Sequence, residues 1–177
     1  MIVFLDFEAS SLSKQSFPLE VGWVFEDERS VSFLIHPPPE WTDWSDEAEA
    51  IHGISREKLQ RDGAPVEIVA RTMVDTLSGH ELFASAPSWD GKWLSVLLRA
   101  AGFPRHTLRM KKSDDAFLQA AREILGDTQT EEQIARLVAD VVSRTEPPVP
   151  AHRALPDAKV ELRRLMKVRE LAMELTS

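Results

Sequence analysis

The 177-residue chain contains no cysteine, so it has no disulfide framework, no thiolate nucleophile and no cysteine-based zinc site. It also lacks any apolar run near the roughly 18 residues of a membrane span, which predicts a soluble, cytoplasmic protein with no membrane partner. Positive charge is scarce, because 21 Lys and Arg stand against 29 Asp and Glu, a formal net charge of −8. This balance argues against a protein that coats nucleic acid through bulk charge, since such binders are usually basic. It does not exclude an enzyme that grips nucleic acid locally through metal ions.

The composition is that of a folded domain. Hydrophobic residues make up 43% of the chain and charged residues 28%, both near the average of globular proteins. The length fits one hydrophobic core, and no internal repeat, low-complexity tract or boundary interrupts it. We therefore expect a single domain over residues 1–177.

The order of hydrophobic patterns predicts an α/β protein. An apolar run at 2–7 and a hairpin formed by 19–25 and 30–35 predict three strands in an antiparallel meander. Further strands at 81–85 and 107–110 alternate with segments of helical periodicity, so the sheet should be mixed and five-stranded, flanked by helices. The expected helices are 45–51, 65–78, 89–101, one around 117–124, one after Thr130 and one at 156–171.

Two acidic residues interrupt the first predicted strand. Asp6 and Glu8 are two positions apart and therefore face the same side of a strand. Chance alone gives roughly one Asp-x-Glu in a chain of this composition, but a pair within an apolar strand is costly to keep without a cation. Carboxylates are the ligands that Mg²⁺ and Mn²⁺ prefer, so the pair is a candidate metal site.

Three more candidates lie near predicted helix starts. Pro156 suits the first turn of a helix, which places Asp157 just inside it and His152 on the loop before it. A fixed carboxylate and an imidazole suit a metal ligand and a general base, although a helix-start acid and a surface histidine explain the same pattern. Asp90 follows the strand at 81–85, where α/β sheets place their sites, but as a lone residue it also fits a helix cap.

Taken together, these residues resemble the DEDDh (DnaQ-like) 3′–5′ exonucleases of the ribonuclease-H-like superfamily. The resemblance covers nearly the whole chain, and HRALPDA at 152–158 is its most specific part. One departure is that Ser85 and Ala86 stand where many relatives carry His-Asn, which affects substrate contacts rather than the metal ligands. The other matching segments are FLDFEASSL at 4–12, EVGWV at 20–24 and IHGIS at 51–55.

The resemblance implies a ribonuclease-H-like sheet and a two-metal mechanism. Two divalent ions, Mg²⁺ or Mn²⁺, would be held by Asp6, Glu8, Asp90 and Asp157, with Asp6 shared between them. His152 would act as the general base. The products would be nucleoside 5′-monophosphates, released from single-stranded or frayed 3′ ends of DNA or RNA.

Substrate contacts and partners follow from the same resemblance. Leu12, Ala9 and His52 lie in matching segments and would contact the 3′-terminal nucleotides, although Leu12 also fits an ordinary loop anchor and His52 a helix cap beside Gly53. Trp89 could stack on a base or pack against Trp93 one helical turn away. A short footprint on a single-stranded 3′ end is expected, and relatives include homodimers and polymerase-bound monomers. A basic cluster at 105–112 either guides the strand or is a solvated surface.

Two alternatives belong to other classes. The chain could be a catalytically weak or inactive homologue that acts as a nucleic-acid or polymerase-binding module. It could also be a phosphohydrolase that acts on small nucleotides. A hydrolysis assay distinguishes the first alternative from an active exonuclease. A dependence of the rate on polymer length distinguishes the second alternative from an exonuclease.

Overall fold

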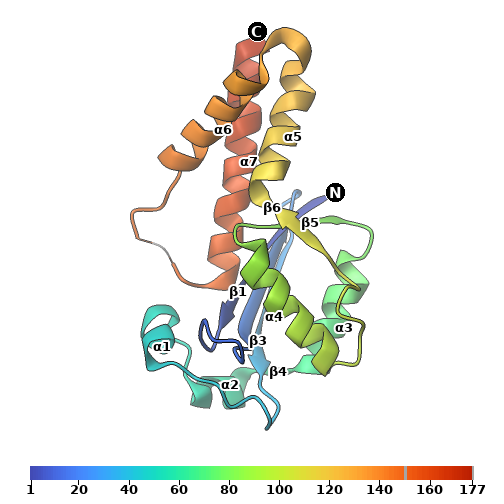
Figure 1. The fold of residues 1–177 in the computed structure, drawn as a ribbon, viewed down its shortest axis with the longest axis vertical. Coiled ribbons are helices and arrows are strands. Elements are labelled where there is room, and N and C mark those ends of the chain that lie inside the picture. The colour runs from blue at the N-terminus through green and yellow to red at the C-terminus, as the bar shows by residue number, and fades with distance from the viewer. Residues whose placement is uncertain (150, 177) are drawn as a thin grey trace.

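The computed structural model describes residues 1–149 and 151–176 and has a mixed six-stranded sheet in the order β4-β3-β2-β1-β5-β6 (Figure 1). β1, β2 and β3 form the expected antiparallel meander, and β5 pairs with β1 in parallel. The expected α/β architecture with a mixed sheet is thus confirmed, with six strands instead of five. The added strand is β4, two residues long and too short to leave a sequence pattern. The strands are β1 (Ile2–Ala9), β2 (Pro18–Phe25), β3 (Ser30–His36), β4 (Ala64–Pro65), β5 (Glu81–Ala84) and β6 (Met110–Lys112).

The described residues form seven α-helices. Figure 1 shows α1 to α4 in one half of the molecule and α5, α6 and α7 in the other. The sequence missed α2, a seven-residue helix with a single buried residue, Leu59, because one apolar residue gives no periodicity. The helices are α1 (Asp46–His52), α2 (Arg56–Asp62), α3 (Val66–Leu77), α4 (Pro87–Ala100), α5 (Ser113–Leu125), α6 (Glu131–Arg144) and α7 (Ala154–Thr176), with a 3₁₀ turn at Gly126–Thr128.

Helix ends follow local sequence signals. The Thr130 side chain accepts from the Gln133 N–H and the Gln133 side chain accepts from the Thr130 N–H, the reciprocal capping pair that starts α6. α7 begins at Ala154, two residues before the expected Pro156, and continues to Thr176 instead of Leu171. The earlier start has a tertiary cause, because the Glu20 carboxylate of β2 accepts from the Ala154 N–H at 3.0 Å.

The two faces of the sheet bury separate clusters. Val3, Leu5 and Phe7 of β1 pack on the side of α3 and α4. Phe4, between them, packs on the opposite side, with Phe117 of α5 at 5.9 Å between ring centroids. Because side chains alternate along a strand, Asp6 and Glu8 share the face of Phe4. This face therefore changes from apolar to acidic along β1, beneath α7.

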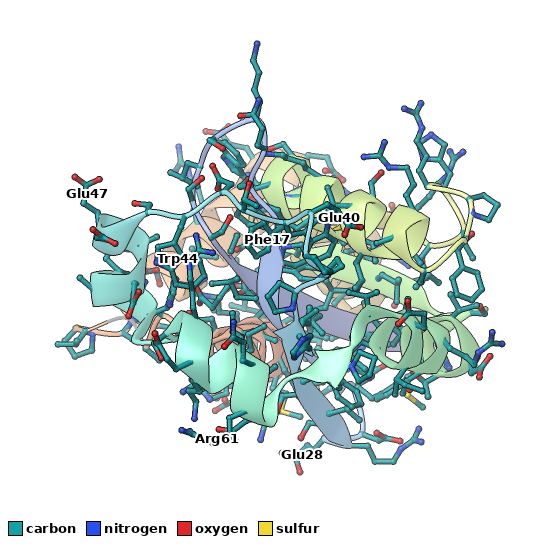
Figure 2. All side chains as sticks on the ribbon, turned by 90° about the horizontal axis from the view of Figure 1, so that it is seen from below. Phe17, Glu28, Glu40, Trp44, Glu47 and Arg61 are labelled. Carbon is teal, nitrogen blue, oxygen red and sulfur yellow. The ribbon has the colours of Figure 1, made fainter. Side chains whose placement is uncertain are left out.

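A third, small cluster supports the loops at one end of the sheet. Phe17, Leu19, Ile54 and Leu59 are buried together beneath Trp41 and Trp44, and Figure 2 shows Phe17 near the middle of this end. Charged residues such as Glu28, Glu47 and Arg61 lie at the periphery of the same view. The cluster anchors α1, α2 and the loop after β1. Within the described residues, no helix is long and apolar enough to cross a membrane.

Candidate active site

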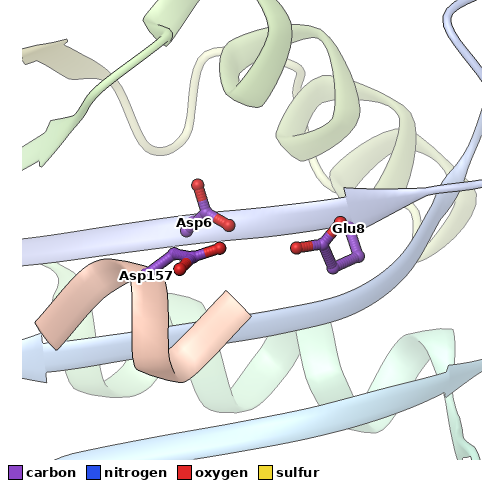
Figure 3. Close-up of side chains that lie close together, drawn as sticks. All are labelled: Asp6, Glu8 and Asp157. Atoms are coloured by element: carbon purple, nitrogen blue, oxygen red, sulfur yellow. The ribbon is translucent and has the colours of Figure 1, made fainter. Parts of the chain in front are cut away.

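Three carboxylates converge at the junction of β1 and α7. Asp6 and Glu8 project from one face of β1, and Asp157 approaches them from the first turns of α7 (Figure 3). One oxygen of each lies within 4.8 Å of the other two. The strand period of two puts the first pair together, and the packing of α7 supplies the third. Oxygen atoms at this spacing suit a divalent cation.

Two residues of β2 fix α7 over these carboxylates. Glu20 lies opposite Glu8 in the sheet register, is only 4% exposed, and accepts hydrogen bonds from Arg153 Nε at 2.9 Å and from the Ala154 N–H. Gly22 lies opposite Asp6, and a Cβ there would come within 2.4 Å of the Leu155 nitrogen. The helix therefore rests directly on the strand backbone. From sequence alone, neither contact could be found, because the partners are more than 130 residues apart.

Asp90 joins the site from α4. Its side chain is buried, at 2% exposed, and its Oδ1 accepts a hydrogen bond from the Phe7 N–H at 3.2 Å. Phe7 lies between the two acids of β1, so the fourth carboxylate is held against the same stretch of strand. The acidic residues expected from β1, α4 and α7 are thus brought to one place.

Burial perturbs all four carboxylates, and repulsion from the neighbouring acids adds to it at Asp6 and Glu8. Burial, followed by the charge of Asp90, holds the pKa of Asp6 well above its ordinary value. Burial and the charge of Asp157 raise the pKa of Glu8 to about 8, and burial raises the pKa of Asp90 to about 7. Burial also raises the pKa of Asp157. Such shifts mean that the negative charges lack compensation from the protein, so the donor set fits a bound cation.

A cavity of about 230 Å³ opens beside the carboxylates. It is lined by Asp6, Asp157 and Ser85, one of the two residues that replace the expected His-Asn. On its far side, the buried Arg164 is paired with Glu161 at 2.6 Å. The cation of Arg164 is therefore already engaged, which leaves the carboxylate end of the cavity acidic.

His152 lies at the edge of this arrangement. It is exposed, precedes α7 and has a positive φ of 49°, and it is not part of the group of three carboxylates. Its charge lowers the pKa of Asp157, against the larger effect of burial, which places it near that residue. The neighbouring Arg153 is pinned to Glu20, so the loop that carries His152 is attached to the sheet.

His52 carries a buried ring N–H near the backbone of Ala9. It is 7% exposed, and its Nδ1 accepts from the Ile54 N–H at 3.0 Å, which puts the proton of the neutral ring on Nε2. Nε2 is buried and forms no hydrogen bond of standard geometry with the described residues, although the Ala9 backbone lies close enough for a weak hydrogen bond to the ring. Burial lowers the pKa of His52. A buried donor without a well-aligned partner is an available contact for a ligand.

Leu12 and Trp89 line a shared cavity of about 290 Å³. Leu12 is 70% exposed and Trp89 37% exposed. Trp89 also stacks on Trp93 at 5.7 Å between centroids, so both of the roles considered for it, packing and an open ring, are present. Ser13, Lys14 and Lys92 complete the lining.

Asp43 holds the loop that presents Leu12. Its carboxylate accepts hydrogen bonds from the hydroxyls of Ser10, Ser11 and Ser13 at 2.6–2.7 Å. Burial raises the pKa of Asp43, but these donors outweigh it and leave the pKa below its ordinary value. No sequence signal marked Asp43, because the serines lie about 30 residues away.

No family model matches the chain, and no curated protein matches it. Solved structures do match. A zinc-bound complex of E. coli exonuclease I with single-stranded DNA has a TM-score of 0.67 at 13% identity, covering 99% of this chain and 42% of that one. Exonuclease I from Methylocaldum szegediense has a TM-score of 0.69 at 16% identity, with 98% and 42% covered.

The nuclease domain of 3′hExo, described as a DEDDh family member bound to rAMP, has a TM-score of 0.65 at 15% identity. This match covers 97% of the present chain and 93% of that domain. The chain has the DEDDh exonuclease fold. It spans about two fifths of the exonuclease I chains but nearly the whole of the DEDDh nuclease domain.

Proposed function

We propose that this chain is a metal-dependent 3′–5′ exonuclease that releases nucleoside 5′-monophosphates from single-stranded or frayed 3′ ends of DNA or RNA. The observation that carries the proposal is the convergence of Asp6, Glu8 and Asp157 within 4.8 Å, with Asp90 buried against the same strand. Structures with this fold are described as complexes with single-stranded DNA and with rAMP, which supports this substrate class.

The four carboxylates would hold two divalent ions, Mg²⁺ or Mn²⁺. Asp6 would be shared, Glu8 and Asp157 would complete one set of ligands, and Asp90 would serve the other. When bound, such ions neutralise phosphodiester charge and stabilise the attacking and leaving oxygens. The raised pKa values of Glu8 and Asp90 fit this assignment, since a cation stabilises the ionised carboxylates.

The other residues would bind and orient the substrate and move protons. His152 would accept a proton from the attacking water, because an imidazole titrates near neutral pH. The His52 Nε2–H would donate to the 3′-terminal nucleotide beside the Ala9 backbone. Leu12 and Trp89 would contact the terminal bases across their shared cavity, with the Trp89 ring as a stacking surface.

We also propose that residues 1–177 form a single exonuclease domain, since one nuclease domain matches along almost the whole chain. Ser85 and Ala86 replace a His-Asn pair, so the contacts that this pair would make must come from elsewhere. A homodimer or a polymerase partner is compatible with this arrangement.

The test uses 5′-labelled single-stranded DNA and RNA of equal sequence, incubated with Mg²⁺, Mn²⁺ or EDTA. We expect a ladder that shortens from the 3′ end, requires metal, and disappears in Asp6→Asn. His152→Ala should bind Mn²⁺ in calorimetry as the wild type does but cleave about 10²–10⁴-fold more slowly, the usual size of a general-base contribution.

The controls separate the alternatives. Asp75→Asn changes an acid on α3, away from the carboxylate cluster, and should leave both rate and metal binding unchanged. Metal binding without cleavage of either strand, but with hydrolysis of small nucleotide esters, would favour a small-molecule phosphohydrolase. Absence of both cleavage and metal binding would contradict the catalytic proposal and favour a binding module.

A further inference from the structure

One stretch of this acidic chain carries several Lys and Arg residues and no acid. Residues 91–112 contain six Lys and Arg and no Asp or Glu, whereas the whole chain has a net charge of −8, so the remainder carries −14. This stretch comprises most of α4, the loop after it and β6. It therefore forms a local basic surface on a chain whose net charge is negative.

The basic stretch encloses a hollow of about 320 Å³ between α4 and the loop before β6, called here the basic hollow. Its size lies at the lower end of the roughly 300–1,000 Å³ typical of small-ligand sites. Gly91 forms part of the α4 wall, and no atom lies within 4 Å of the position that its Cβ would occupy. The polar side is formed by the two cations Arg105 and Arg109 together with His106, and the apolar side by Leu94, Leu108 and Met110.

The arginines of the hollow are not engaged by acids. Lys111 and Lys112, on β6, are paired with Glu81 and Asp114. In contrast, neither Arg105 nor Arg109 forms an ion pair with any described residue, and Arg105 Nε donates only to His106 at 2.8 Å. Slight burial and the charges of both arginines lower the pKa of His106, which confirms that the three groups lie close together.

The hollow adjoins the candidate active site through α4. Pro87 and Gly91 lie on either side of Asp90 on this helix and line the hollow. Ser95 also lines it, and a rise of 1.5 Å per residue places Ser95 about 8 Å from Asp90 along the helix axis. Trp89 and Gly91 are about 200° apart around the helix. The Leu12–Trp89 cavity and the basic hollow therefore lie on opposite sides of the segment that carries Asp90.

We propose that the basic hollow binds a backbone phosphate of the same single strand whose 3′ end lies at the carboxylates, upstream of the nucleotide being removed; this rests on the proposed exonuclease function. Free guanidinium groups suit phosphate oxygens, and the apolar side accommodates a base or sugar. The footprint then extends beyond the few terminal nucleotides expected from sequence, and the strand crosses α4.

The test compares two double variants with the same change of charge. Arg105→Ala/Arg109→Ala removes the free cations of the hollow. Arg136→Ala/Arg144→Ala removes two exposed arginines of α6 and is the matched control. Binding of fluorescent single-stranded oligonucleotides of about 20 and about 3 nucleotides is measured by anisotropy in EDTA between 50 and 200 mM salt, where each lost phosphate contact changes the log–log slope by about 0.7. Hydrolysis of the p-nitrophenyl ester of thymidine 5′-monophosphate reports on the carboxylate site alone.

For the long oligonucleotide, the wild type and the control should lose about sevenfold more affinity over this salt range than the hollow variant, the effect of two contacts. The salt slope for the short oligonucleotide and the hydrolysis rate of the nitrophenyl ester should each be equal in all three proteins. Equal salt slopes for the hollow variant and the control overturn the proposal. The proposal also fails if an acidic peptide displaces the fluorescent oligonucleotide more strongly than the unlabelled oligonucleotide does. If the wild type hydrolyses nothing, the proposed function fails, while the salt slopes still decide whether the hollow binds a nucleic acid strand.

Discussion

Replacing Gly22 with alanine tests whether the backbone contact between β2 and α7 sets the geometry of the carboxylates. The new Cβ would lie 2.4 Å from the Leu155 nitrogen, and ordinary contacts begin at 3.4 Å. The three nearest atoms, Leu155 N, Leu155 Cα and Ala154 C, all belong to the backbone, so the start of α7 has to move by about 1 Å. That movement separates Asp157 from Asp6 and Glu8. Misplacement of this size costs about 10²-fold in rate.

We therefore expect the rate of 3′-terminal cleavage by Gly22→Ala to fall about 100-fold and its Mn²⁺ affinity in calorimetry to fall with it. Overpacking of this kind destabilises a fold by about 1–3 kcal/mol, which corresponds to a decrease in Tm of about 3–9 °C for this chain length. Calorimetric metal binding is included because it does not depend on the substrate.

The control has a comparable loss of stability without movement of α7. Val69 is fully buried on α3, on the opposite face of the sheet, and Val69→Ala leaves a small cavity that costs about 1–3 kcal/mol. This variant should retain its cleavage rate and Mn²⁺ affinity well below its Tm. Wild-type Mn²⁺ affinity and a rate within threefold of wild type in Gly22→Ala would refute the reasoning.

Three further predictions concern the carboxylates and the loop beside them. In EDTA, stability should fall as pH rises towards 7 and 8, because folded Asp90 and Glu8 have pKa values of about 7 and about 8 and therefore bind more protons than in the unfolded chain. Scanning fluorimetry from pH 5 to 8.5 should show the Tm falling across this range, and a flat profile would contradict the burial argument. Mn²⁺ at about 100 times its Kd should raise the Tm of the wild type by about 5–10 °C, and an equal rise in Asp6→Asn would argue against Asp6 as a ligand. Asp43→Ala leaves three serine hydroxyls without their acceptor, so we expect the free energy of unfolding to fall by about 1–3 kcal/mol. In steady-state kinetics, KM should change more than kcat because Leu12 shifts. An unchanged KM would show that the loop does not contact substrate.

Several features of the site could be predicted from the sequence because they depend on local periodicity. Asp6 and Glu8 share a face since strand side chains alternate, and Asp157 lies near a helix start since Pro156 suits that position. The order of strands and helices likewise follows from hydrophobic patterns. The shortest elements, α2 and β4, could not be predicted, because seven residues with one buried side chain and two residues of strand carry no periodic signal.

Only the tertiary structure decided how close these residues come and what environment they share. The contacts of Glu20 and Gly22 with α7 bring Asp157 to β1 across more than 130 residues of sequence, and Asp43 collects three serines from another segment. The raised pKa values arise from burial and from charges on separate elements, and the basic hollow forms where α4 meets the loop before β6. Local sequence specifies side-chain direction, because that direction depends on backbone periodicity. The distances between site residues, their burial and their electrostatic environment depend on packing between segments that are remote in the chain.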